Sequence, residues 1–301
     1  MEWQGKRESD NVQDARGESS GGFSGGGGAG GGGLGLLMTI GRIFGFKGIL
    51  AAVVVGAVLW KMGIVDPSML LGGAAPAGRT QRTVAGSAQE EERLRFVKVV
   101  MTETEEVWTA EFAKHGQRYQ LPKMKVYRGQ TATACGNGSA EMGPFYCPGD
   151  QVVYIDLSFY DELAETFKSP GDFAQAYVIA HEVGHHVQKL LGTSDKVAAR
   201  HEQPDYNEYS VRLELQADFY AGVWAYHSKA DLKLDNSDIE EAMTAANAIG
   251  DDMIQKKMQG RVTPAAFTHG TAAQRMRWFR KGLESGRMED GDTFSMSYGS
   301  L

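Results

Sequence analysis

The sequence HEVGH at residues 181–185 constrains this chain more than any other feature. Residues four apart lie on one face of an α-helix, so a helix here would bring the imidazoles of His181 and His185 to one metal ion. The carboxylate of Glu182 can stand near a water molecule at that metal without being a ligand itself. The preceding residues 176–180 carry no charge, which is typical of a buried helix. The motif therefore predicts a buried helix that carries two zinc ligands and a base.

The HEVGH motif supplies only two protein ligands, so a third residue decides the kind of zinc site. A glutamate, Glu214, occurs in the apolar, proline-free segment 209–226, with Asp218 four residues further on, and we expect this segment to be a buried helix. Buried carboxylates need a cation or a hydrogen-bond donor. Glu214 would satisfy this need by binding zinc. Asp218 would satisfy it by accepting a hydrogen bond from the second ring nitrogen of a ligand histidine. Alternatively, the two carboxylates pair with Arg212 or Lys229 at the surface.

Other residues compete with Glu214 for the role of third ligand. The rivals are His186, His201, Glu202 and Glu208. His186 is a poor candidate, because adjacent residues point roughly 100° apart around a helix. His201 and Glu202 lie in a polar segment that is rich in loop-forming residues, and they stay open as ligands.

The first 88 residues differ in composition from the rest of the chain. Residues 1–42 are charged and then rich in glycine, which predicts a disordered cytoplasmic segment. Residues 43–65 predict a transmembrane signal anchor, because the apolar run from Gly48 to Val65 has a single charge, at Lys61. A cleaved signal peptide and a buried soluble helix are the alternatives.

With such an anchor in the lipid bilayer, residues 66–88 form a linker and residues 89–301 a single periplasmic or extracellular domain. The formal net charge of −7 argues against nucleic acid as a main partner. In an oxidising compartment, Cys135 and Cys147 would pair as a disulfide and contribute about 3 kcal/mol of stability. In a reducing compartment they would be two free thiols.

Hydrophobic periodicity predicts an α+β domain in which helices dominate and the sheet is small. The expected helices cover 90–113, 158–167, 172–191, 209–226, 238–258 and 271–282, and the expected strands cover 123–128 and 151–156. Asp172 is a candidate cap for the active-site helix, and Thr271 with Gln274 forms a capping box for the last helix. The strand 151–156 either borders the cleft and pairs with an extended peptide or lies in the interior of the sheet.

Taken in order along the chain, these segments resemble the bacterial putative neutral zinc metallopeptidase family. The resemblance covers nearly the full length. It includes the polar start at 7–12, the glycine run, the apolar segment, the motifs at 134–136, 143–148 and 153–156, the HEVGH motif, the helix with Glu214 and Asp218, and the segment 267–275. The resemblance implies a zincin-like fold and a membrane-anchored peptidase.

The residues predict a zinc peptidase of the gluzincin type with one catalytic zinc ion. His181, His185 and Glu214 would hold Zn²⁺ and leave its fourth position for water. Zinc would lower the pKa of that water and polarise the peptide carbonyl, and Glu182 would take the proton of the water and pass it to the leaving amine.

The anionic intermediate of peptide hydrolysis needs a hydrogen-bond donor besides the metal. His269 is our candidate, since it stands just before a predicted helix start, next to Gly270. Its alternative role is a local hydrogen bond at the helix entry. Tyr206 and Tyr209 are alternative donors.

Two other functions compete with peptide hydrolysis. One is a membrane-tethered binding or scaffold protein that keeps the zinc fold without useful hydrolysis. Glu182 argues against it, because a purely structural zinc site does not need that carboxylate. The other is a zinc hydrolase that acts on a non-peptide amide of the cell wall, which the sequence does not distinguish from a peptidase.

Overall fold

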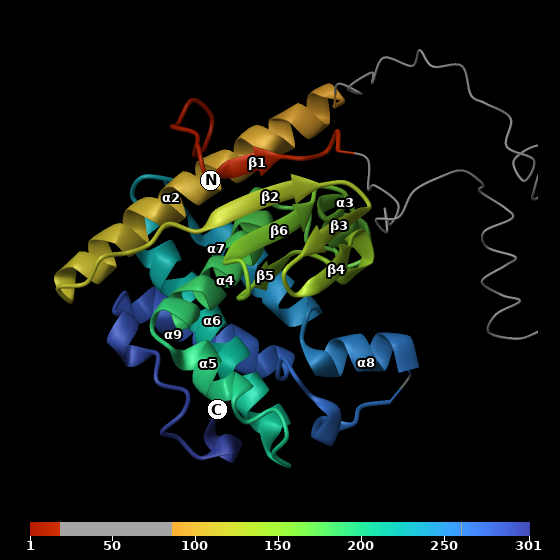
Figure 1. Ribbon diagram of the computed structural model, residues 1–301, viewed down its shortest axis with the longest axis vertical. Coiled ribbons are helices and arrows are strands. Elements are labelled where there is room, and N and C mark those ends of the chain that lie inside the picture. Colours follow the sequence, from red (N-terminus) through yellow and green to blue (C-terminus); the bar gives the residue numbers. More distant parts are fainter. Residues whose placement is uncertain (19–85, 260) are drawn as a thin grey trace, which may run out of the picture. The chain divides into compact units, whose positions relative to one another are not determined.

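Helices make up most of the folded chain, and a small sheet lies against them (Figure 1). The computed structural model describes residues 1–18, 86–259 and 261–301. The helices are α2 (Ala88–Lys114), α3 (Phe159–Glu165), α4 (Asp172–Leu190), α5 (Thr193–Ala198), α6 (Tyr206–Ser228), α7 (Asn236–Ala248), α8 (Asp251–Gln259) and α9 (Ala272–Ser285). The strands are β1 (Val12–Asp14), β2 (Lys123–Tyr127), β3 (Gln130–Thr133), β4 (Gly136–Ser139), β5 (Phe145–Cys147) and β6 (Val152–Asp156).

The main sheet has the strand order β1-β2-β6-β5, and β3 and β4 form a separate hairpin. Strands β1, β2 and β6 are parallel, whereas β5 runs antiparallel to β6, with Tyr146 opposite Val153. The run Val153–Ile155 of β6 is buried, as expected for a strand with neighbours on both sides. The predicted strand 151–156 is therefore the interior strand, and β5 is the edge strand instead.

The first 18 residues belong to the folded domain, contrary to the disordered segment predicted for residues 1–42. β1 pairs with β2, with Val12 opposite Met124 (Figure 1). The indole of Trp3 is buried and donates a hydrogen bond of 3.0 Å to Asp172 at the start of α4. Ser9 donates to Glu105 of α2 at 2.5 Å. Composition misled here, because these residues dock through polar side chains and only a few buried apolar ones, Trp3, Val12 and Ala15.

The predicted single-pass membrane topology is wrong. None of the helices in the described ranges is both long enough and apolar enough to cross a bilayer. The anchor predicted at 43–65 itself lies outside the described residues. We therefore withdraw the membrane anchor and the periplasmic or extracellular location derived from it.

Close approaches between helices place the residues of the site. A Cβ on Gly184 of α4 would lie 3.0 Å from the carbonyl oxygen of Ala217, so this glycine lets α4 pack directly on α6. Gly222 of α6 and Gly282 of α9 face each other in the same way, and a Cβ on either would collide with the backbone of the other helix. Side chains of α4, α6 and α9 therefore meet at short range.

Helix boundaries differ from the prediction at two points. The predicted helix 238–258 is two helices, α7 and α8, which are interrupted at Gly250. A Cβ at Gly250 would collide with the backbone of Ala272, so the chain bends here to pack on the start of α9. Gly171, and not Asp172, is the N-cap of α4. The capping box of Thr271 and Gln274 at the start of α9 is confirmed.

The predicted disulfide between Cys135 and Cys147 is present. Cys147 is fully buried at the end of β5, whereas Cys135 is exposed after β3. The bond closes a ring of chain that contains β4, a short 3₁₀ turn (Ala140–Met142) and β5. Residues of this ring form part of the cleft that is described below.

Candidate metal centre

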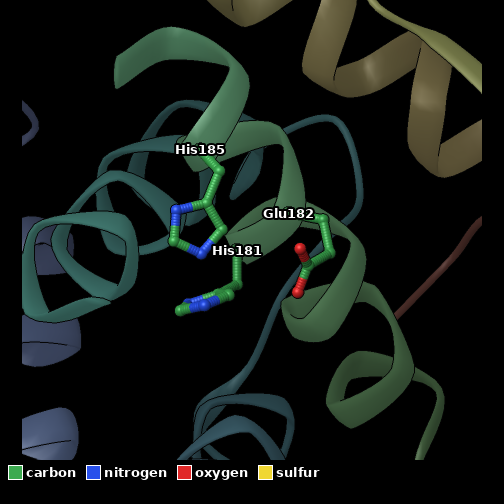
Figure 2. Close-up of side chains that lie close together, drawn as sticks. All are labelled: His181, Glu182 and His185. Carbon is green, nitrogen blue, oxygen red and sulfur yellow. The ribbon is translucent and has the colours of Figure 1, made fainter. Parts of the chain in front are cut away.

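Two imidazoles and a carboxylate of α4 lie close together, as the HEVGH motif predicts. One potential ligand atom from each of His181, Glu182 and His185 lies within 4.8 Å of the others. Figure 2 shows both rings on one side of the helix, with the carboxylate of Glu182 beside them. His181 and Glu182 are buried, and His185 is largely so. The helix thus presents two nitrogen donors and one carboxylate in a confined space.

Glu214 reaches both histidines from α6. Its carboxylate oxygens lie 3.2 Å from Nε2 of His181 and 3.5 Å from Nε2 of His185. The structure therefore brings together the three residues predicted to hold the metal. The close packing at Gly184 makes this contact possible, because it lies between the two histidines in sequence and brings α4 against α6.

The rival ligands lie elsewhere. His201 and Glu202 are exposed and face each other, with 3.6 Å between Nδ1 and Oε1. Glu208 is also exposed. His186 points away from the pair, with Nδ1 3.0 Å from the hydroxyl of Tyr146 and Nε2 2.7 Å from the carbonyl of Gln120.

Asp218 lies on the second nitrogen of His181, as predicted. Oδ1 of Asp218 is 2.8 Å from Nδ1 of His181 and also accepts a hydrogen bond of 2.5 Å from Tyr177. Arg275 of α9 donates from Nε and Nη2 to the two oxygens, each at 2.8 Å. Asp218, Tyr177 and Arg275 are all buried. Arg212, the proposed surface partner, instead donates to the carbonyl of Thr293.

Three residues that hold the candidate ligands in place were not predicted from the sequence. Tyr177 and Arg275 hold Asp218, and Gln188 places Oε1 2.9 Å from Nδ1 of His185. Tyr177 and Gln188 had a usable signal, because Tyr177 precedes His181 by four residues and Gln188 follows His185 by three, both at helical spacing. Arg275 had none, since its role depends on the packing of α9 on α6.

The charges of the site compensate one another without a metal. Burial opposes protonation of the imidazoles, but Asp218 raises the pKa of His181, and Glu214 raises that of His185 to about 9. Burial also opposes ionisation of Glu214, but the two histidines hold its pKa well below the usual range. The carboxylate of Glu214 thus faces two imidazoles whose pKa values are both raised.

This donor set fits a divalent zinc ion. Zn²⁺ would balance the Glu214 carboxylate in place of protons on the imidazoles, and it would take two Nε2 atoms and one carboxylate as ligands. Two histidines and a glutamate are a ligand set of catalytic zinc sites, which keep one coordination position open. Asp218 and Gln188 supply the hydrogen bonds that orient such ligand histidines.

Glu182 differs from Glu214 in its surroundings. Burial raises the pKa of Glu182, against the charges of His181 and His185 and a hydrogen bond from the backbone of Tyr146. A carboxylate with a raised pKa is a better proton acceptor than an ordinary glutamate. Glu182 is therefore suited to accept a proton and pass it on.

The cluster opens into a cleft of about 750 Å³. His181, Glu182, His185, Glu214, His269 and Arg275 line it, together with residues 141–146 of the disulfide ring and apolar residues of α3, α4, α7 and α8. His269 is half-exposed, and the hydrogen bond with Asp251 and the charge of Glu214 raise its pKa. Among the described residues that line this cleft, neither Tyr206 nor Tyr209 occurs.

Asp251 holds the segment that carries His269. One oxygen of its carboxylate accepts hydrogen bonds from the backbone N–H groups of Thr268, His269 and Gly270, at 2.6 to 3.0 Å. Its other oxygen lies 3.3 Å from Nδ1 of His269. The predicted local hydrogen bond at the helix entry is thus present, and the imidazole also faces the cleft.

A buried helix with two histidines, a facing glutamate and an open cleft are the features that a hydrolytic metal site requires. The chain belongs to the putative neutral zinc metallopeptidase family, which it matches over residues 1–294. It is 47% identical to the uncharacterized protein YpfJ of Escherichia coli strain K12, over 99% of this chain and 100% of that protein.

More distant similarity extends to mycobacteria. The uncharacterized proteins Mb2605 of Mycobacterium bovis and Rv2575 of Mycobacterium tuberculosis are each 45% identical over 59% of this chain and 64% of their own length. No solved structure matches this chain. The zincin-like fold implied by the sequence resemblance is therefore not confirmed.

Proposed function

We propose that this protein is a peptidase that uses one zinc ion, held by His181, His185 and Glu214. The observation that carries the proposal is the position of the Glu214 carboxylate, which reaches Nε2 of both motif histidines from a separate helix. Family membership supports a zinc hydrolase at the coarse level. Bound zinc would supply a Lewis acid and a water molecule of lowered pKa.

The chain itself supplies a base and a donor. Glu182, whose pKa burial raises, would take a proton from water and deliver it to the leaving nitrogen. His269 would donate a hydrogen bond to the oxyanion, because its imidazole lines the same cleft and its raised pKa favours the protonated form. Asp218 and Arg275 would hold the ring of His181 in its working orientation.

The edge strand β5 supports a polypeptide as the substrate. It has β6 on one side, and Phe145 and Tyr146 line the cleft. The backbone of Tyr146 hydrogen-bonds to Glu182, so this strand runs directly beside the proposed base. An extended peptide can pair with the free side of such a strand.

A metal analysis joined to a digest of a peptide library tests the proposal. We expect one zinc ion per chain and cleavage that a chelator abolishes. Glu182→Gln should abolish cleavage and retain zinc, whereas His185→Ala and Glu214→Ala should lose both. His201→Ala is the matched control and should keep both.

The same experiment separates the competing functions. Zinc binding without cleavage of any peptide, in both wild type and Glu182→Gln, would exclude a peptidase and leave a binding protein or a hydrolase of a non-peptide amide. Full zinc content in Glu214→Ala would show that the third ligand is another residue.

A further inference from the structure

One part of the cleft is apolar, and it lies one helical turn from the metal ligands. Val178 precedes His181 by three residues on α4, so both side chains lie on the same face. Around it stand apolar side chains from four other segments. We call this group the apolar pocket; it consists of Met142, Phe159, Phe167, Val178, Ile249 and Ile254.

The members of the apolar pocket come from separate elements that the fold holds in place. Phe159 begins α3, and Phe167 follows the end of that helix, just before α4. Ile249 and Ile254 flank the bend between α7 and α8. Arg275 donates to the carbonyl of Ile249 at 3.2 Å, and the same guanidinium holds Asp218. The pocket is thus tied to the metal-ligand cluster through one side chain.

The pocket retains apolar surface that faces solvent. Phe167, Ile249 and Ile254 are only partly buried, and Met142 at the rim is 60% exposed. An apolar concave surface beside convergent polar groups is typical of a site that binds an apolar ligand group, because burial removes that surface from water.

The charged residues at the rim are mostly engaged or face outward. Lys257 donates from Nζ to the carbonyl of Thr166 at 2.9 Å and lies 5.6 Å from the centre of the Phe167 ring. Glu141 and Glu162 line the cleft but are exposed to solvent. A charged substrate side chain in the pocket would lose its hydration without gaining a buried partner.

We propose that the apolar pocket makes the enzyme select peptide bonds next to a large apolar residue, so its substrates are apolar segments of extended polypeptides. This inference rests on the proposed peptidase function. Full burial of a leucine or phenylalanine side chain, relative to alanine, gives roughly a 10- to 100-fold preference.

The test compares fluorogenic peptides that differ only at the residue beside the scissile bond, with the full-length, zinc-loaded protein. We expect kcat/KM for phenylalanine or leucine to exceed that for alanine about 10- to 100-fold, and aspartate or lysine to be the poorest. Phe167→Ala should remove most of this preference, chiefly by lowering kcat/KM for the phenylalanine and leucine peptides. Ile254→Ala is a second variant on a different helix. The matched control is Leu121→Ala, an exposed leucine outside the cleft.

A binding measurement supplies a readout that does not depend on turnover. Zinc-loaded Glu182→Gln should bind the phenylalanine peptide more tightly than the alanine peptide, and adding Phe167→Ala should cancel that difference. Cleavage that does not depend on the residue beside the scissile bond, or that prefers lysine or arginine there, would contradict the proposed role of the apolar pocket. The proposed peptidase function would still stand. Failure to cleave any peptide would overturn the proposed function and the pocket with it.

Discussion

The two walls of the cleft are built in different ways. The buried wall consists of α4, α6 and α9, where His181, Asp218 and Arg275 are each at most 6% exposed and bonded to one another. The open wall consists of residues 141–146, α8 and His269, where Met142 and the side chain of His269 are more than half exposed. The wall that would hold the metal is buried and hydrogen-bonded, whereas the wall that would meet the substrate is accessible. Substitutions on the buried wall should therefore lower stability as well as activity, whereas substitution of a single exposed side chain on the open wall should lower activity alone.

The largest expected effect lies on the buried wall, at Arg275. Arg275→Leu leaves the Asp218 carboxylate buried without its cation, which costs about 3–5 kcal/mol of unfolding free energy. Urea denaturation measures this loss. Arg280→Leu on the same helix is the matched control, because Arg280 is exposed, and it should change stability by no more than about 0.5 kcal/mol. A small effect at Arg275 would mean that the buried wall is not held by this pair.

The open wall should behave in the opposite way. His269→Ala should lower kcat about 10²- to 10³-fold, the effect of losing one oxyanion donor. KM, zinc content and unfolding free energy should stay near wild type, because the side chain is half-exposed. His201→Ala, an exposed histidine outside the cleft, serves as the control. Recovery of kcat by added zinc alone would indicate a role in metal binding instead.

Removal of the disulfide tests whether the open wall contributes to the stability of the fold. Replacing Cys135 and Cys147 together by serine should cost about 2–4 kcal/mol of unfolding free energy. The zinc content should not change, because the metal-holding residues belong to the buried wall. Reduction of the wild type by a phosphine should reproduce the loss, and the double variant should not respond to the phosphine. Loss of zinc on reduction would show that the two walls are coupled.

The smallest effect concerns acid stability of the metal-free protein. Burial raises the pKa of Asp218, but Arg275 and His181 outweigh it and bring the pKa to about 2. Since this pKa lies below the unfolded value, the carboxylate stabilises the fold above about pH 4. That stability is lost as the pH falls towards 2. The loss should be about 2 kcal/mol between pH 5 and pH 2. Denaturation at several pH values should show a shallower acid dependence in Asp218→Asn.

Local signals were enough to predict most of the buried wall. The spacing within HEVGH, the apolar run around Glu214 and the capping box at Thr271 are all properties of single helices, and the structure has helices at each place. The contact between Glu214 and the two histidines could also be predicted, because a buried carboxylate needs a cation or a hydrogen-bond donor. Arg275 could not be found in this way, since it reaches Asp218 only after α9 has packed on α6.

The rest of the fold depended on contacts that are distant in sequence. Strand β5 has only three residues, so alternation could not reveal it, and its edge position depends on β6. The interruption at Gly250 reflects packing against Ala272 and not helix propensity. The polar segment around Ser9 and Asn11 has the composition of a disordered chain, yet both side chains donate to Glu105 of α2.

The pairing of β1 with β2 also has a kinetic consequence. Val12 of β1 lies opposite Met124 of β2, so β1 is synthesised long before the strand with which it pairs. Closing a long loop has a large entropic cost before any contact compensates for it, and parallel pairing of distant strands is slow. We therefore expect docking of the first 18 residues to be a late step in folding. Until then, the edge of β2 is open to strands of other molecules, and the newly made chain is most prone to aggregate in that interval.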